Sequence, residues 1–62
     1  MTAREVEVLS LVAQGLTDAK IAEQLTLSTF TVNNHVRSIY GKLDVPNRAA
    51  ATRYAIEHQL VE

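Results

Sequence analysis

The 62-residue chain contains no cysteine, only one proline and only two glycines. Without cysteine, neither a disulfide framework nor a thiolate metal site can hold a small fold together. No run of about 18 apolar residues is present that could span a membrane, and no signal peptide is visible. We therefore expect a single domain that depends on its hydrophobic core alone, in a reducing cytoplasmic setting. A chain of this length also excludes a multi-domain enzyme and a large enclosed site.

Charge of either sign is scarce as well. Six Lys and Arg stand against seven Asp and Glu, which gives a formal net charge of -1. Because nucleic-acid-binding domains are often strongly basic, this total argues mildly against a nucleic-acid partner. The middle of the chain differs from its ends, since residues 28–48 carry Arg37, Lys42 and Arg48 against Asp44 alone. Hydrophobic residues make up 47% of the chain, which predicts a compact core.

The apolar residues recur at helical spacing from the start of the chain. The first helix is expected to begin at Thr2, because Glu5 three residues later completes a capping-box pattern. Gly15 is a natural residue to end it in a left-handed conformation. Thr17 is the next plausible N-cap, and it predicts a short helix over about 18–25.

A break at 26–28 separates this short helix from a third, predicted over about 29–43, which Ser28 is free to cap. Pro46 cannot continue the third helix, and Asn47 is placed to cap a fourth over about 48–59. Four short helices with short breaks predict an all-α fold, a small four-helix orthogonal bundle. Its second and third helices form a helix-turn-helix, whose second helix can lie in the major groove of DNA.

The predicted third helix has two contrasting faces. The face opposite its apolar stripe carries Asn33, Asn34 and Arg37, residue types that pair with adenine and guanine edges. Because these residues stand at i, i+1 and i+4, they can meet neighbouring base pairs, and Gly41 leaves room for the duplex. The apolar stripe consists of Val32, Val36, Ile39 and Leu43.

These segments also resemble one protein family closely. The matching stretches are Leu-Thr-Asp-Ala-Lys-Ile-Ala (16–22), Leu-Ser (27–28), Thr-Val (31–32), His-Val (35–36), Ile-Tyr (39–40), Lys-Leu (42–43) and 45–48. They resemble the LuxR-type helix-turn-helix domain, which is the output domain of NarL/FixJ-class response regulators and of quorum-sensing LuxR-type regulators. The resemblance implies one DNA-binding domain over 1–62 that regulates bacterial transcription and dimerises through its last helix.

The resemblance also implies which residues contact DNA. Base-reading positions of the family fall on Asn33, Asn34 and Arg37. The sequence departs from the family at Asn33, where many members carry Lys, and at Phe30, where a basic or polar residue is common. It also has Gln59 where a glycine often stands. The role of Phe30 stays open between a thymine contact, a surface position and a contact with the first helix. Positions that contact the DNA backbone fall on Thr17, Lys20, Thr29, Thr31, Lys42 and Arg48.

Alternatives remain for these side chains. Lys42 and Arg48 are also explained as solvated surface charges, and the threonines as capping or first-turn residues. The whole chain has an alternative function as a helical protein-protein interaction module on the same fold, using the outer face of the third helix. A steep loss of affinity with salt distinguishes DNA binding from such a contact.

The fourth helix has two faces of low polarity, whereas a domain of this size has one core. We predict that one face is a small dimer interface, paired with its own copy on a near-palindromic DNA site. Leu11, expected on the outer side of the first helix, is the alternative interface. The patch is smaller than a stable interface, so the free domain is expected to be mostly monomeric. The core-facing set is Ala51, Tyr54, Ala55 and His58, and the interface set is Ala49, Thr52 and Ile56.

No catalytic or cofactor site is expected. His35 and His58 belong to different predicted helices and form no ligand pair with each other or with carboxylates. The sequence has no glycine-rich phosphate loop and no serine with a recognisable base beside it. We therefore expect no enzyme activity, no metal and no cofactor. Because the family usually attaches this module to an N-terminal receiver or ligand-binding domain, the chain is expected to be a C-terminal part of a larger regulator or a stand-alone member.

Overall fold

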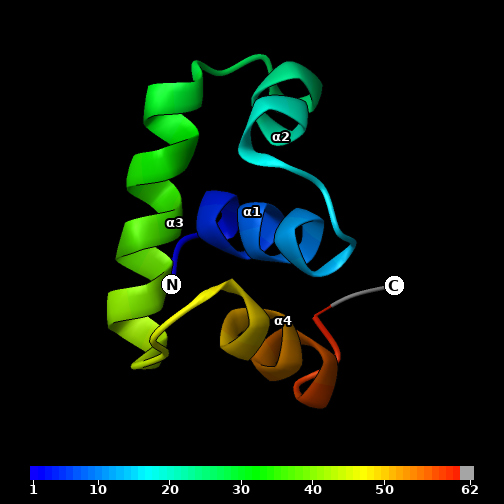
Figure 1. The fold of residues 1–62 in the computed structure, drawn as a ribbon, viewed down its shortest axis with the longest axis vertical. Helices are drawn as coiled ribbons and strands as arrows, with labels where there is room; N and C mark the ends of the chain where they lie inside the picture. The colour runs from blue at the N-terminus through cyan, green and yellow to red at the C-terminus, as the bar shows by residue number, and fades with distance from the viewer. Residues whose placement is uncertain (61–62) are drawn as a thin grey trace.

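A computed structural model describes residues 1–60 of the chain, so the last two residues of the predicted domain lie outside the described part. The four helices are α1 (Ala3–Ala13), α2 (Asp18–Leu25), α3 (Thr29–Leu43) and α4 (Arg48–Glu57), and the described residues form no strand. In Figure 1, α1 lies between α2 and α4, and the longer α3 runs along one side of all three. The prediction of an all-α four-helix fold is confirmed.

Each helix begins at a residue whose side chain accepts a hydrogen bond from the backbone N–H three residues further on. Such a cap satisfies one of the N–H groups that lack a partner in the first turn of a helix. At α1 the capping box is complete, because the Thr2 backbone N–H also donates to Glu5 Oε1 at 3.0 Å. All four predicted caps are therefore confirmed, and they are Thr2, Thr17, Ser28 and Asn47.

The helix ends follow the prediction less closely. Gly15 has the expected left-handed backbone after α1, with φ +91. The helix α4 ends at Glu57, so the prediction that it continues to about residue 59 is wrong. Gln59 has φ 56, in the left-handed region that favours glycine, and this conformation ends the helical path. This left-handed conformation gives a physical reason for the glycine that the resemblance places near this position.

The core lies where the apolar faces of the four helices meet around α1, which packs against each of the others. The predicted stripe of α3 is confirmed, with Leu43 half-buried and its other three members buried. In α4, the fully buried Ala51 and Ala55 are small enough to let this helix approach α1 closely. The largest fully buried side chains are Leu9, Ile21, Ile39, Val8 and Val32.

The predicted exposure of two side chains, His58 and Leu11, is wrong. His58 does not face the core: it is exposed and stacks on Tyr54 with ring centroids 4.1 Å apart, because α4 has already ended. Leu11 does not lie on the outer side of α1, since it is buried together with Val8, Leu9 and Val12. Three helices pack on α1 and cover more than one of its sides, so Leu11 offers no interface.

Candidate nucleic-acid interface

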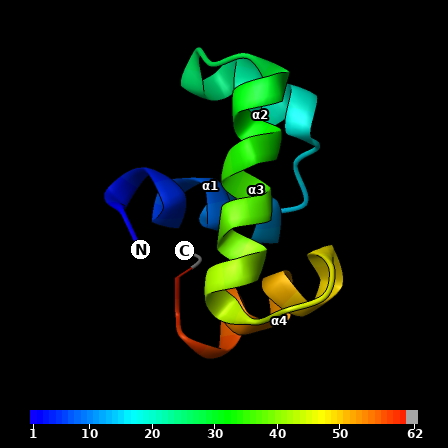
Figure 2. The same cartoon turned by 90° about the vertical axis from the view of Figure 1, so that its left-hand side faces the viewer.

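The outer face of α3 is the surface that the sequence predicts for base reading. Figure 2 shows α3 in front of the other helices along its whole length. Asn34, Arg37 and Gly41 are exposed there, and Asn33 is half-buried at the flank. The structure thus places the predicted base-reading residues on the side of α3 that faces away from the core. Of these residues, Asn33 lies furthest from the middle of that outer side.

Gly41 extends this face toward the C-terminal end of α3. The residues Asn34, Arg37 and Gly41 stand at i, i+3 and i+7, so they follow one line along the helix. A Cβ added at Gly41 would meet no atom within 4 Å. Packing inside the protein therefore does not require glycine here, which agrees with the prediction that the position leaves room for a ligand.

Five of the six basic side chains are paired with carboxylates inside the domain. Within residues 1–60, Arg37 is the one Lys or Arg that has no carboxylate oxygen within 4.0 Å. Its guanidinium is exposed on the outer face of α3, so all of its donors are available to a partner. The ion pairs are Arg4–Glu7, Lys20–Glu23, Lys42–Glu5, Arg48–Asp18 and Arg53–Glu57.

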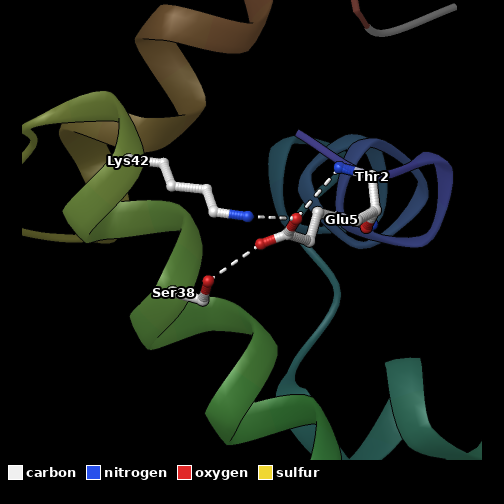
Figure 3. A network of polar contacts seen from close by, with 4 residues as sticks. All are labelled: Thr2, Glu5, Ser38 and Lys42. Carbon is white, nitrogen blue, oxygen red and sulfur yellow. Dashed lines mark hydrogen bonds and ion pairs between the residues drawn. The ribbon is translucent and has the colours of Figure 1, made fainter.

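Lys42 belongs to a network around a buried carboxylate, that of Glu5, which is only 3% exposed. Figure 3 shows Lys42 Nζ donating to Glu5 Oε1 at 2.7 Å and Ser38 Oγ donating to Glu5 Oε2 at 2.9 Å. The Thr2 backbone N–H donates to the same group. The network ties the first turn of α1 to the C-terminal half of α3, so Glu5 helps to fix how α3 lies on the bundle.

These donors also explain the acidity of Glu5. The hydrogen bond from Lys42, followed by those from the Thr2 backbone and Ser38, lowers the pKa of the Glu5 carboxyl from the ordinary 4.5 to about 2. Sequence reasoning identified Glu5 only as half of a capping box. Its other two partners lie 33 and 37 residues away along the chain, and no local pattern indicates them.

Acid is therefore expected to weaken the fold through Glu5. Because the pKa is lower in the folded chain, the contribution of Glu5 to stability is present above about pH 4.5 and is lost as the pH falls toward about 2. We expect Glu5→Gln to be less stable than the wild type at pH 6, with a difference that shrinks toward pH 2. Urea unfolding across this range measures it. Glu7→Gln, in the exposed part of the same helix, is the control that should keep the wild-type pH profile, and a pH-independent difference for Glu5→Gln contradicts the assignment.

Arg48 joins α4 to the start of α2. Its guanidinium donates to Asp18 Oδ1 at 3.1 Å and to the backbone carbonyl of Leu16. Arg48 and Lys42 were both predicted to contact phosphates, and the structure shows that each already has an acidic partner. The Lys42 side chain is 47% exposed, so part of it still reaches solvent.

The other predicted backbone contacts lie near the N-terminal ends of α2 and α3. Thr17 and Thr29 are exposed, as is Lys20, whose Nζ lies 3.9 Å from Glu23 Oε2. Thr31 Oγ1 accepts a hydrogen bond from Ser28 Oγ at 2.8 Å. Helix N-termini favour anions, because their N–H groups and the helix dipole both point toward the ligand. Four of the six predicted contacts thus lie at the starts of α2 and α3, the two helices of the helix-turn-helix.

No group of three or more His, Cys, Asp or Glu that could hold a metal ion occurs among residues 1–60. Within that part of the chain, no helix has both the length and the hydropathy needed to cross a membrane.

Comparisons with known proteins agree with this architecture. The sequence profile of the bacterial regulatory proteins of the luxR family matches residues 1–55. The chain is 43% identical over 61 residues to the transcriptional regulatory protein LiaR of Bacillus subtilis, covering 98% of this chain and 29% of LiaR. It is 39% identical over 62 residues to the response regulator protein VraR of Staphylococcus aureus, covering 100% of this chain and 30% of VraR.

A solved structure gives the same result for the fold. The crystal structure of the response regulator ChrA in a heme-sensing two-component system superposes with a TM-score of 0.87 at 42% identity, covering 95% of this chain and 29% of ChrA. The chain spans less than a third of the length of each of these relatives. These matches confirm the resemblance found in the sequence: the chain belongs to the luxR family of bacterial regulatory proteins, as a helix-turn-helix domain.

Proposed function

We propose that this domain binds double-stranded DNA sequence-specifically by placing α3 in the major groove. The observation that carries the proposal is the outer face of α3, which presents Asn34 and Arg37 on an open side of the bundle. Arg37 has no carboxylate partner within residues 1–60. An α-helix fits the major groove, where Asn pairs with adenine and Arg with guanine. Asn33 is proposed to read a base from the flank of the helix, since it is half-buried.

The proposed phosphate contacts come from the two helix starts and from the paired cations. Thr17, Lys20, Thr29 and Thr31 surround the N-termini of α2 and α3, where phosphates are favoured. Lys42 and Arg48 are proposed to contribute more weakly, because Glu5 and Asp18 compete for them. The salt dependence of binding should therefore be less steep than three free cations at Lys20, Lys42 and Arg48 would give.

Dimerisation on DNA is proposed through the exposed side of α4. Ala51 and Ala55 face the core, and Ile56, which is 61% exposed, lies outside it. Ala49 is exposed and Thr52 half-buried, so the three predicted interface residues form a small stripe beside the core face. A two-fold contact would pair this stripe with its copy and set two α3 helices in successive major grooves of a near-palindromic site. The stripe is small, so the free domain is expected to be monomeric.

The domain is also proposed to belong to a longer bacterial regulator. Its relatives are named as transcriptional and response regulators, and the chain covers less than a third of each. A receiver or ligand-binding domain N-terminal to this one would control it, and the regulator would act in the cytoplasm, where the DNA lies.

Selection of bound duplexes from a random pool tests this function. We expect the chain to enrich one recurrent half-site, and we expect its affinity for that site to fall with salt, by about 0.9 in the log–log slope for each phosphate neutralised. No enrichment, together with binding that salt does not change, would contradict the proposal. It would favour a protein-interaction module that uses the same face of α3.

A further inference from the structure

Phe30 is the most exposed of the large hydrophobic side chains in the described part of the chain, at 75%. It is the second residue of α3. A single exposed hydrophobic residue needs no explanation by itself, because protein surfaces contain many of them. The position of Phe30 on α3 is what distinguishes it.

Phe30 lies in the middle of the outer face. It stands four residues before Asn34, seven before Arg37 and eleven before Gly41, so the four positions follow one line along the helix. The buried residues Val32, Val36 and Ile39 lie on the opposite side. The ring therefore continues the proposed base-reading line toward the N-terminus of α3, about 6 Å along the axis from Asn34.

The surroundings of Phe30 do not form an apolar docking patch. Its neighbours on the exposed surface of α3 are Asn33 and Asn34, which are polar. Among residues 1–60, the other large exposed hydrophobic side chains are Met1 and Ile56. Figure 1 shows that the end of α3 that carries Phe30 lies beside α2, whereas α4, which carries Ile56, lies at the opposite end of the molecule. Phe30 is therefore not part of a continuous exposed apolar patch on which another protein could dock.

The major groove offers one apolar group to such a ring. Among the base edges exposed there, only thymine presents a methyl group, and Phe is a residue type that contacts it. In helix-turn-helix proteins, the N-terminal residues of the recognition helix are those that touch base edges. Within residues 1–60, Arg37 is the one Lys or Arg of α3 that has no carboxylate partner. An apolar contact would add sequence preference that salt does not weaken.

From this geometry we infer that Phe30 is a specificity-determining residue that packs against the 5-methyl group of a thymine in the DNA site. The inference rests on the proposed function. It assigns the base step next to that of Asn34, on the side toward the N-terminus of α3, to an apolar contact.

Replacement of thymine by deoxyuridine tests the contact, because it removes the methyl group and leaves the base pair intact. Each thymine of the selected site is replaced in turn, and affinity is measured for the wild type and for Phe30→Ala. At one position we expect the replacement to weaken wild-type binding about three- to tenfold, the size of one buried methyl group, and to leave Phe30→Ala unchanged. Phe30→Leu should retain part of this sensitivity, because leucine is still apolar.

Arg37→Ala is the matched control on the same line of α3. It should lose its own base preference and keep the sensitivity to the methyl group. If the wild type selects no sequence at all, the proposed function itself is wrong. If it selects a site in which every replacement affects the wild type and Phe30→Ala equally, or a site without thymine at that step, the function stands and the role of Phe30 is wrong.

Discussion

Arg37→Ala is expected to weaken binding to the selected DNA site by about 1–3 kcal/mol, which is about five- to 150-fold. Arg37 is exposed and has no carboxylate partner within residues 1–60, so its guanidinium can donate two hydrogen bonds to one guanine. The loss of affinity should be confined to the selected duplex, because the variant would no longer prefer guanine at one position of the site. Anisotropy titrations at one salt concentration measure the affinity for the selected duplex and the affinity for a scrambled duplex.

Arg4→Ala provides the control for this experiment. It removes one positive charge from an exposed side chain that pairs with Glu7 in α1 and makes no ion pair with α3. We expect it to change affinity for both duplexes little, because Arg4 is not among the proposed DNA contacts. Equal effects of Arg4→Ala and Arg37→Ala, with an unchanged selected sequence, would show that the base-reading face is assigned wrongly.

Ile56→Glu is expected to abolish cooperative binding to the full near-palindromic site. The two copies of the glutamate would face each other across the two-fold axis, and like charges placed together at an interface cost several kcal/mol. Ile56 is 61% exposed, so the core should not be disturbed and the affinity for a half-site should stay close to that of the wild type. Mobility-shift titrations on full and half sites compare the two quantities.

Ile56→Ala separates charge repulsion from loss of apolar contact. It should reduce cooperativity by less than Ile56→Glu, because it removes only buried apolar area. Wild-type cooperativity in Ile56→Glu would show that the copies meet elsewhere. Leu11 cannot be that surface, because it is buried in the core.

The starts of the helices and the outer face of α3 follow from local sequence. Each N-cap bonds a backbone N–H only three residues away, so Thr2, Thr17, Ser28 and Asn47 could be identified without any tertiary information. The outer face of α3 follows from the helical period, because the positions opposite a buried stripe must be exposed. The end of α4 is an exception. It depends on the left-handed backbone of Gln59, and the residue type alone does not indicate that conformation.

What only the tertiary structure decides is the pairing of charged side chains that lie far apart in the sequence. Lys42 and Arg48 were predicted to contact DNA phosphates because they lie beside the helix that is expected to enter the groove. Their carboxylate partners, Glu5 and Asp18, lie 37 and 30 residues away in the sequence. A helical period gives the direction in which a side chain leaves its helix. The approach of two such side chains is set by the angles at which the helices pack. The sequence by itself therefore determined the helix-turn-helix and the outer face of α3, and packing alone decided that Lys42 and Arg48 bind the protein's own carboxylates.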